Sequence, residues 1–505
     1  MVKGGLGSRE LSENIREAVL EAVSPTDEER TTLKEVCDKL LERVRGVIDD
    51  LGLKRVEPML AGSAAKGTML KEPDIDVFAV FPEATPQEVL EEMGLRIGTM
   101  TLDDPRKKYT QHPYITGTFL GWNCDIVPCL AITKGSRVST AVDRTPHHTR
   151  YVNSRMTGTQ KEEVLLLKSF LKGIGAYGAE DTVQGCSGYL VELLVLGFGN
   201  FDGVINWFAG MDLDIHSSGG YEEIAAPNHE AGKKWTVLFD ELPLMDEVPL
   251  PPMEYAKMFA QDPLVVVDPV DSRRNVASPV SVQTLSYISR ASREILSDQG
   301  LSFFHPFSRR PYRGPSSGEA VRAEGETLFM LDLPEGDPGM VITQLRRSIR
   351  KLAEGMTRAG FEGVTARFLL VFPEGHDIDL SYLRSRYAWT MPNGGPSITV
   401  YLVTVPEVLP REYVHWGPPI DNPRFSDFKR KWGGRVEVDE EEGRGYVIQK
   451  REAVDPSSIA LEVWKGSTHG SSFGDPEPVP IDDRAPASCF LQVFRDGFDP
   501  WRSKA

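Results

Sequence analysis

The sequence contains few cysteines and no long apolar run. Its five cysteines are an odd number without regular spacing, which argues against a disulfide framework and favours a reducing compartment. Cys124 and Cys129 lie in an apolar run, and no second cysteine or histidine pair stands at the spacing of zinc ligands. No run approaches the roughly 20 apolar residues of a membrane-spanning helix, and the polar beginning MVKGGLGSRELSENIREAV is unlike a signal peptide. We therefore expect a cytoplasmic protein with no membrane partner.

Positive charge is also in deficit. Lysine and arginine number 57 against 74 aspartates and glutamates, which gives a net charge of −17. This total weakens a nucleic-acid hypothesis without removing it, because phosphate binding requires only a local basic stripe.

The length of 505 residues is too great for one hydrophobic core, and about three or four domains are expected. Periodicity predicts a mixed α/β unit first, an almost wholly helical stretch at 147–208 and a long, mainly exposed excursion near 209–262. A second α/β region follows, with a helix near 281–298 and a β-α-β-β unit over 327–405. The elements predicted for the first unit are helices 9–23 and 26–51, strands 56–60 and 75–81, a helix near 86–96, and strands 114–120 and 124–132.

The segment GSAAKGTMLKEPDIDVF, from Gly62 to Phe78, ends in two acids one residue apart. Asp74 and Asp76 lie on the same face of a predicted strand, because side chains alternate along a strand. Two adjacent carboxylates repel each other unless a cation lies between them, and magnesium prefers such oxygen ligands. The alternative interpretation is a solvent-exposed strand face that carries a DxD pattern.

A glycine-serine turn, Gly62-Ser63, begins this segment. It follows the apolar strand VEPMLAG and precedes a short helical stretch, AAKGTML. The backbone N–H groups, the serine hydroxyl and the helix dipole of such a turn form a cradle for phosphate groups. Lys66, one turn further on, is placed to add positive charge.

A third acid, Asp125, lies within the apolar strand GWNCDIVPCLAI. An aspartate there is costly unless it is paired or bound to a metal. Three carboxylates on adjacent strands can hold two magnesium ions about 4 Å apart, the spacing used for in-line nucleotidyl transfer. This third acid favours the metal site over the solvent-exposed strand face.

The order of a glycine-serine pair, a DxD pair and a distant aspartate resembles the nucleotidyltransferase superfamily that includes DNA polymerase beta. Further segments make nearly the whole chain similar, in the same order, to the archaeal, class I CCA-adding enzymes. These segments are AVDRTPHHTRYV (141–152), LLKSFLKGIGAYGAE (166–180), GCSGYLVELLVLGFGNF (185–201), VVDPVDSRRNVA (266–277), TQLRRSIRKL (343–352) and HWGPPI (415–420).

This resemblance implies a multidomain α/β and α+β fold. It implies a polymerase-beta-like nucleotidyltransferase head, a helical neck, an α+β body and a β-α-β-β tail. The implied domains are the catalytic head at 1–146, the neck at 147–262, the body at 263–325 and 406–505, and the tRNA-binding tail at 326–405.

The resemblance also implies site residues. Asp74, Asp76 and Asp125 match the catalytic carboxylates that bind the metal ions. The family usually has arginine where Lys66 stands, so this chain keeps the charge and loses the bidentate fork. The positions implied to bind the nucleotide are Ser63, Lys66, His148, Lys168 and Tyr177, together with Arg274, which would help to choose cytosine or adenine.

From the residues alone, four of these positions have simpler interpretations. His148 would be a surface or capping histidine, and Tyr177 a packing aromatic. Lys168 would be a lysine that snorkels from the edge of an apolar helix face. Arg274 would form a salt bridge with Asp268 or Asp271.

Local basic clusters offset the acidic total. They include KRKWGGR (429–435), which mixes basic and aromatic residues. Such rows are usually the solvated side of an amphipathic helix, but a same-sign row without intervening acids fits phosphate contact better. In the resembled family they belong to the parts that contact the acceptor stem and T-arm of tRNA. The RNA-binding candidates are Arg346, Arg347, Arg350 and Lys351 on the predicted helix 338–360, and Arg309, Arg310 and Arg313 in RRPYR.

The function that the resemblance implies is template-independent addition of CCA to the 3′ end of tRNA. The substrates would be CTP and ATP, the cofactors two Mg²⁺ ions, and pyrophosphate would be released. The alternatives are a poly(A) or oligoadenylate-type nucleotidyltransferase and a catalytically silent RNA-binding relative. The intact set of three costly acids argues against a silent relative, and family analogy suggests a homodimer.

Overall fold

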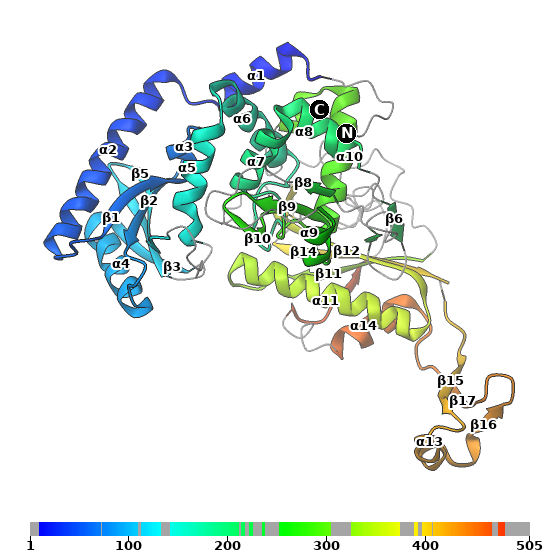
Figure 1. The fold of residues 1–505 in the computed structure, drawn as a ribbon. Coiled ribbons are helices and arrows are strands. Elements are labelled where there is room, and N and C mark those ends of the chain that lie inside the picture. The colour runs from blue at the N-terminus through cyan, green and yellow to red at the C-terminus, as the bar shows by residue number, and fades with distance from the viewer. Residues whose placement is uncertain are drawn as a thin grey trace. The chain divides into compact units, whose positions relative to one another are not determined.

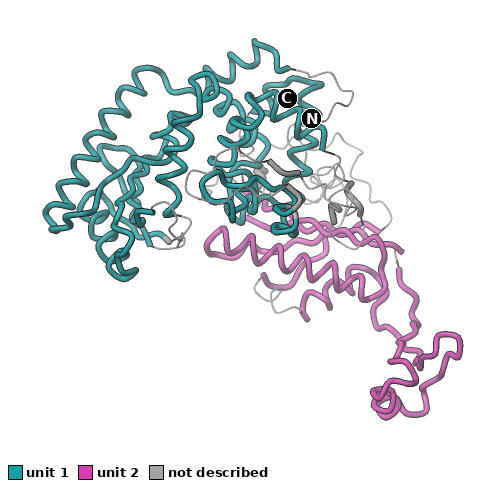
Figure 2. Tube along the Cα trace, viewed as in Figure 1, with its two compact units in different colours: residues 1–214, 224–309, 500–505 teal, residues 215–223, 310–499 magenta. Residues whose placement is uncertain are grey.

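The structure is a computed structural model of the 505-residue chain. It divides into two compact units (Figure 2). Unit 1 comprises residues 1–214, 224–309 and 500–505, and unit 2 comprises residues 215–223 and 310–499.

The structure does not describe every residue. Most of the predicted excursion at 209–262 lies outside the described residues, as do Arg309, Arg310 and Arg313. The described residues are 10–71, 73–109, 113–132, 142–211, 214–217, 222–225, 235–237, 252–304, 325–373, 388–391, 396–406, 408–466 and 473–479.

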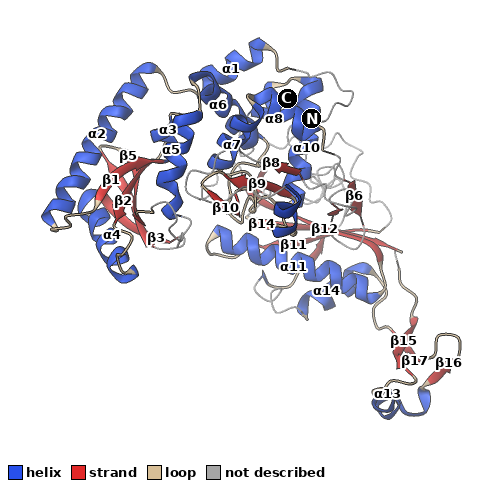
Figure 3. Ribbon diagram, viewed as in Figure 1, coloured by secondary structure: helices blue, strands red, loops and turns tan. Residues whose placement is uncertain are grey.

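The first part of unit 1 is a five-stranded sheet with helices packed on it (Figures 1 and 3). The strand order is β1-β2-β5-β4-β3, and β2 pairs with β5 in parallel while the other pairs are antiparallel. The elements are α1 (Glu13–Val23), α2 (Asp27–Asp50), β1 (Glu57–Ala61), α3 (Gly62–Lys66), β2 (Ile75–Phe81), α4 (Gln87–Thr101), β3 (Asp103–Tyr109), β4 (Pro113–Phe119) and β5 (Trp122–Leu130).

Helices α2 and α4 cover one face of this sheet. The capping box of Thr26 and Glu29 begins α2, and its apolar stripe packs on the strands as the helical periodicity predicts. β3 is the exception, because DDPRKKY has no apolar alternation and forms a strand only by pairing with β4 at the sheet edge. The shared core includes Leu33, Leu40, Val44, Ile75, Val77, Ile97 and Ile126.

The rest of unit 1 is mainly helical and adds one small sheet. Over 147–208 the structure agrees with the predicted helical stretch, and the strand order of the small sheet is β10-β9-β8. The elements are η1 (Val142–Arg144), α5 (Thr145–Arg155), α6 (Gly158–Gly173), α7 (Gly188–Phe198), α8 (Phe201–Ala209), β8 (Trp235–Val237), α9 (Pro252–Met258), β9 (Leu264–Asp268), β10 (Asp271–Asn275), α10 (Val282–Asp298) and η2 (Leu301–Phe304).

Within the described residues, no single helix is long and apolar enough to cross a membrane. Helices α7 and α8 reach that length and composition only as a pair, and they meet at an angle of 94°. Most of their apolar side chains are buried in unit 1.

Unit 2 is built on a second five-stranded sheet (Figure 3). Its strand order is β13-β12-β14-β11-β18, and a separate three-stranded sheet has the order β15-β17-β16. Strands β6 (Asp214–Ser217) and β7 (Glu222–Ala225) form a further pair. The other elements are β11 (Glu326–Asp332), α11 (Pro338–Ala359), β12 (Glu362–Pro373), β13 (Ala388–Met391), β14 (Ser397–Val405), β15 (Glu412–Pro419), α13 (Phe425–Trp432), η4 (Gly433–Arg435), β16 (Glu437–Asp439), β17 (Arg444–Lys450), α14 (Pro456–Lys465) and β18 (Glu477–Val479).

The β-α-β-β unit predicted over 327–405 appears as β11, α11, β12 and β14. Segments after residue 405 also join this sheet and its core. β18 pairs with β11, and Trp464 of α14 is buried against the side chains that α11 contributes. Residues 326–405 and these later segments therefore form one folding unit.

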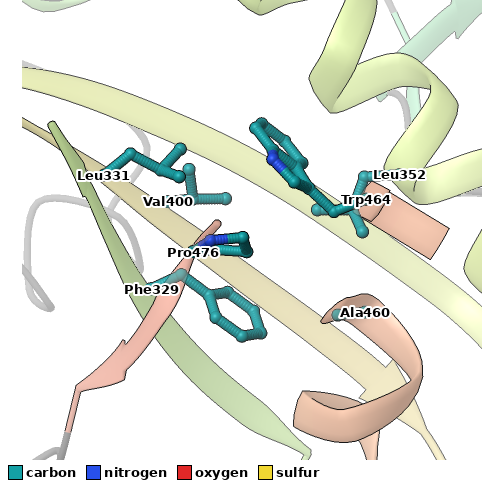
Figure 4. Close-up of a pocket in the computed structure, with 7 residues that line it drawn as sticks. All are labelled: Phe329, Leu331, Leu352, Val400, Ala460, Trp464 and Pro476. Atoms are coloured by element: carbon teal, nitrogen blue, oxygen red, sulfur yellow. The ribbon is translucent and has the colours of Figure 1, made fainter. Parts of the chain in front are cut away.

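A small apolar cavity lies in the core of unit 2 (Figure 4). Its volume is about 10 Å³, near the smallest space that holds one water molecule. It is a packing defect and not a ligand site. The lining residues are Phe329, Leu331, Leu352, Val400, Ala460, Trp464 and Pro476.

Candidate active site

Two of the predicted carboxylates lie side by side on the sheet of unit 1. Asp76 of β2 and Asp125 of β5 are direct partners in the parallel register. They alternate with residues of the core beneath α2 and α4, such as Ile75 and Ile126, so both aspartates project from the opposite face. Asp74 stands just before β2 and is exposed. The structure thus brings together the acids that the sequence separates by about fifty residues.

The glycine of the Gly62-Ser63 turn lies directly against this acidic pair. Ala61 at the end of β1 is the register partner of Asp76, and Gly62 has a φ of +66°. A Cβ atom on Gly62 would lie 1.9 Å from Oδ2 of Asp76. Glycine is therefore required here twice, by its left-handed backbone and by the approach of the carboxylate.

The surroundings of Asp76 and Asp125 disfavour the charged form of both carboxylates. Burial, Asp125 and Asp74 together raise the pKa of Asp76 to about 7. Burial also raises the pKa of Asp125, although a hydrogen bond from Thr116 and the charge of Lys108 oppose this rise. Such clustered, desolvated acids are typical of functional sites.

The donor set suits magnesium. Among the described residues, no three histidine, cysteine, aspartate or glutamate side chains form a ready-made metal site. Magnesium does not need one, because it keeps several waters and is usually bound by one or two carboxylates plus substrate phosphates. The paired oxygens of Asp76 and Asp125, with Asp74 at the strand entrance, fit that mode of binding.

The lysines predicted to bind the nucleotide meet at a buried glutamate. Lys66 Nζ lies 2.5 Å from Oε2 of Glu192, a residue of α7. The other oxygen of Glu192 accepts a hydrogen bond of 2.6 Å from Thr68 Oγ1. Lys168 of α6 donates to the carbonyl oxygen of Thr68 at 2.7 Å. Lys168 is only 2% exposed, so its ammonium is directed inward and does not snorkel to solvent.

A second buried acid, Asp268 at the end of β9, forms hydrogen bonds with a second group of residues in the site. Its carboxylate is 2.9 Å from Nε2 of His148 and accepts hydrogen bonds from Arg274 at 2.8 Å and from the hydroxyl of Tyr189 at 3.1 Å. The rings of His148 and Tyr189 are stacked, with centroids 3.9 Å apart. Lys66 Nζ lies 5.8 Å from the centroid of the Tyr189 ring, so the two acidic centres are neighbours.

Two protein-family models match the chain. A family described as "Nucleotidyltransferase domain" matches residues 38–148, and one described as "tRNA nucleotidyltransferase, second domain" matches residues 162–305. The CCA-adding enzyme of Thermoplasma acidophilum is 32% identical over 86% of this chain and 85% of its own length. The chain belongs to the family of CCA-adding enzymes. The CCA-adding enzymes of Haloarcula marismortui (32% identity, 85% of this chain and 84% of the relative) and Saccharolobus islandicus (30%, 88% and 91%) are also similar.

Solved structures resemble part of this CCA-adding family member at a low level. The Cid1 poly(U) polymerase covers 57% of this chain and 96% of its own, with 14% identity and a TM-score of 0.41. The CdnC protein of E. coli covers 57% and 90%, with 17% identity and a TM-score of 0.41. Likenesses at this level carry no argument about function.

The remaining predicted residues of this family member lie in three places. A Cβ atom on Gly188 at the start of α7 would lie 3.0 Å from the hydroxyl of Tyr177 and 3.9 Å from Nζ of Lys168, so both side chains approach the start of α7. Ser63 is partly buried in α3 beside the acids. Arg346, Arg347, Arg350 and Lys351 lie on α11 of unit 2.

Three residues of the site were not among the sequence candidates: Glu192, Asp268 and Tyr189. Glu192 stands in the apolar helix GYLVELLVLGF, and the argument that singles out Asp125, a costly acid in an apolar element, applies to it equally. Asp268 ends a fully buried strand and carries the same signal. Tyr189 gives no such signal, because a tyrosine at a helix start is ordinary.

Asp268 provides a first test of this arrangement. Burial alone would raise its pKa, but His148, Arg274 and the backbone N–H of Val270 outweigh burial and lower the pKa to about 2 from an ordinary 3.8. The carboxylate therefore stabilises the fold above about pH 4, and this contribution is lost as the pH falls towards 2.

Asp268→Asn should lower the free energy of unfolding at pH 7 by about 2 kcal/mol. Urea denaturation from neutral to acid pH measures this, and the difference from wild type should narrow below about pH 4. Asp298→Asn, at an exposed position of α10, serves as the control. Equal stability of wild type and Asp268→Asn at pH 7 would show that the charge of Asp268 does not hold this network together.

Proposed function

We propose that this protein adds C, C and A to the 3′ end of tRNA without a template, using CTP and ATP. The observation that carries the proposal is its identity of about 32% with curated CCA-adding enzymes over most of both chains. The paired carboxylates Asp76 and Asp125 against Gly62 support it chemically.

In the proposed reaction the terminal 3′ hydroxyl of the tRNA attacks the α-phosphorus of the nucleotide. A bond forms between O3′ and the α-phosphorus, the bond from the α-phosphorus to the bridging oxygen breaks, and pyrophosphate leaves with that electron pair, while the proton of the hydroxyl passes to water. Asp74, Asp76 and Asp125 would hold the magnesium ions, and we expect two such ions. When bound there, magnesium would lower the pKa of the attacking hydroxyl and neutralise negative charge on the triphosphate.

The protein's own residues bind and orient the nucleotide. Lys66 and Lys168 share the single carboxylate of Glu192, so this cluster carries an excess of positive charge that suits a triphosphate. The hydroxyl of Tyr177 approaches the start of α7 at Gly188, as Lys168 does, and Tyr177 would contact the sugar. Arg274 is anchored by Asp268, and its side chain is 30% exposed, so its guanidinium remains accessible to hydrogen-bond the base.

The basic side of α11 would contact the acceptor stem and T-arm. Arg347 and Arg350 are exposed on this helix, and each phosphate contact releases condensed counterions. The double variant Arg347→Gln and Arg350→Gln should bind tRNA about tenfold more weakly at physiological salt. The slope of log affinity against log salt should become shallower by about 2.

Filter binding of tRNA over a range of salt concentrations measures both quantities. Arg358→Gln is the matched control, because Arg358 lies on the same helix, is 72% exposed and faces Glu354 at 3.9 Å. An unchanged salt slope in the double variant would exclude α11 from the phosphate contacts.

The function itself is tested with tRNA that lacks CCA, offered one nucleotide at a time. CTP alone should extend it by two residues, whereas ATP alone should give no extension until CC is present. ATP-only tailing of tRNA and of unrelated RNA would favour the poly(A) or oligoadenylate-type alternative. Binding of tRNA without any transfer would favour the silent relative.

A further inference from the structure

Glu192 is the one acidic side chain of α7, and it is fully buried. It lies three residues after Tyr189, so both project from the same side of the first helical turns. Glu192 contacts Lys66 and Thr68, which belong to α3 and the segment that follows it. The contact therefore joins the helix α7 to the segment that begins with the Gly62-Ser63 turn beside Asp76.

The charges around Glu192 do not balance. Two buried lysines face it, with Lys66 Nζ 2.5 Å from Oε2 and Lys168 Nζ 3.9 Å from Oε1. Burial lowers the pKa of Lys168 to about 8, and the charges of Lys66 and Lys172 act in the same direction. Of the groups that act on Lys168, only the negative charge of Glu192 raises its pKa. Without it, the two ammonium groups would repel each other in a desolvated place.

We propose that Glu192 is a positioning residue for nucleotide binding, which fixes the ammonium groups of Lys66 and Lys168 where the triphosphate of the incoming nucleotide arrives. This inference rests on the proposed function. The carboxylate holds Lys66 directly and holds Lys168 through Thr68, whose hydroxyl it binds and whose carbonyl accepts from Lys168. Because the site is preformed, the nucleotide does not have to order two long side chains when it binds.

The position of lysine at residue 66 fits this role. An ammonium group is a compact point charge with rotatable donors, so its direction depends on its partner more than that of a planar guanidinium does. Glu192 supplies that partner. The lysine thus remains a directed donor although it lacks the fork of an arginine.

Glu192→Gln is the main test, because it preserves shape and can still bind Thr68 while the charge is removed. The KM for CTP and for ATP should rise about tenfold, and kcat should change by less than about threefold. In wild type, KM should rise at alkaline pH as Lys168, which is surrounded by Glu192, Lys66 and Lys172, loses its proton. In Glu192→Gln this rise should begin at a lower pH, because the negative charge that raises the pKa of Lys168 is gone. Glu192→Asp keeps the charge and should recover part of the loss.

The matched control is Glu163→Gln. Glu163 is another buried acid of unit 1, paired with Arg16 at 2.6 Å and accepting from the backbone N–H of Phe201. Its loss should destabilise the fold and leave both KM values unchanged. Wild-type KM values and an unshifted pH dependence in Glu192→Gln would overturn the proposal and leave Glu192 a structural ion pair.

A second pair of variants covers the case in which Glu192→Gln does not fold. Thr68→Val removes the hydroxyl that orients Glu192 and keeps every charge, so KM should rise about threefold, whereas Thr68→Ser should resemble wild type. Equal KM values in both would contradict the proposal.

Equilibrium dialysis of labelled CTP with wild type and each variant adds a readout that is independent of turnover. If the wild type binds CTP but does not add CCA, the proposed function fails while the weaker binding of Glu192→Gln still supports the positioning role. If the wild type adds CCA and binding is unaffected by Glu192→Gln, the positioning role alone fails.

Discussion

Asp125→Asn should reduce nucleotide transfer at least about a thousandfold while tRNA affinity stays within about twofold. The change replaces a carboxylate by an amide of the same shape, so the strand β5 and the contact with Thr116 should survive. What is lost is one negative oxygen beside Asp76. An amide cannot hold a divalent cation in place, and the loss should appear in kcat.

The measurement is single-turnover transfer of CMP to tRNA lacking CCA, with tRNA affinity measured separately. Asp103→Asn, at an exposed position of the same sheet, is the control and should transfer at the wild-type rate. Transfer by Asp125→Asn within about tenfold of wild type would remove Asp125 from the metal site. Lost tRNA binding together with lost transfer would instead indicate a misfolded sheet.

Gly62→Ala should reduce transfer by at least about a hundredfold, because the new methyl group would occupy the place of the Asp76 carboxylate. The Cβ atom would lie 1.9 Å from Oδ2 of Asp76, and the contact can be relieved only if the carboxylate turns away or the β1–α3 turn shifts. The first movement takes the Asp76 carboxylate away from Asp125, and the second moves Ser63 away from the acids.

Gly52→Ala is a closely matched control for this experiment. Gly52 has a φ of +68°, against +66° for Gly62, and a Cβ atom there would meet nothing within 4 Å. Both variants should lose about 1 kcal/mol of stability from the left-handed backbone. Only Gly62→Ala should lose transfer, and equal activity of the two variants would show that the proximity of Gly62 to Asp76 does not matter.

The acids on the sheet could be predicted because their signals are local. Alternation along a strand places Asp76 and Asp125 opposite the apolar core, and a charged residue in an apolar strand indicates a partner or a metal. The glycine-serine turn also follows from composition. The direct pairing of β2 with β5 is not a local property and became visible only in the register.

The residues that hold the side chains predicted to bind the nucleotide could not be placed from the sequence in the same way. Glu192 contacts Lys66 across 126 positions, and Asp268 contacts His148 across 120. No spacing rule covers such separations. For Arg274 the simpler interpretation, an ion pair with Asp268, describes the observed contact, and its part in base choice stays a prediction.

Which later segments join the sheet of unit 2 is likewise not a local property of the sequence. The linear pattern does not show on which sheet the helix α14 packs. Its Trp464 is 2% exposed and completes the core that α11 begins. Packing between segments so far apart in the sequence depends on how their side chains fit together, and the linear pattern does not show which segments pair.

The most direct test of the central claim is the 3′ sequence of the product. Purified protein is given tRNA that ends at the base preceding CCA, with both CTP and ATP and with magnesium, and the extended ends are sequenced. The account predicts that nearly all extended molecules end in CCA and that extension then stops. Homopolymer tails of adenylate, or extension of RNA unrelated to tRNA with equal efficiency, would contradict it.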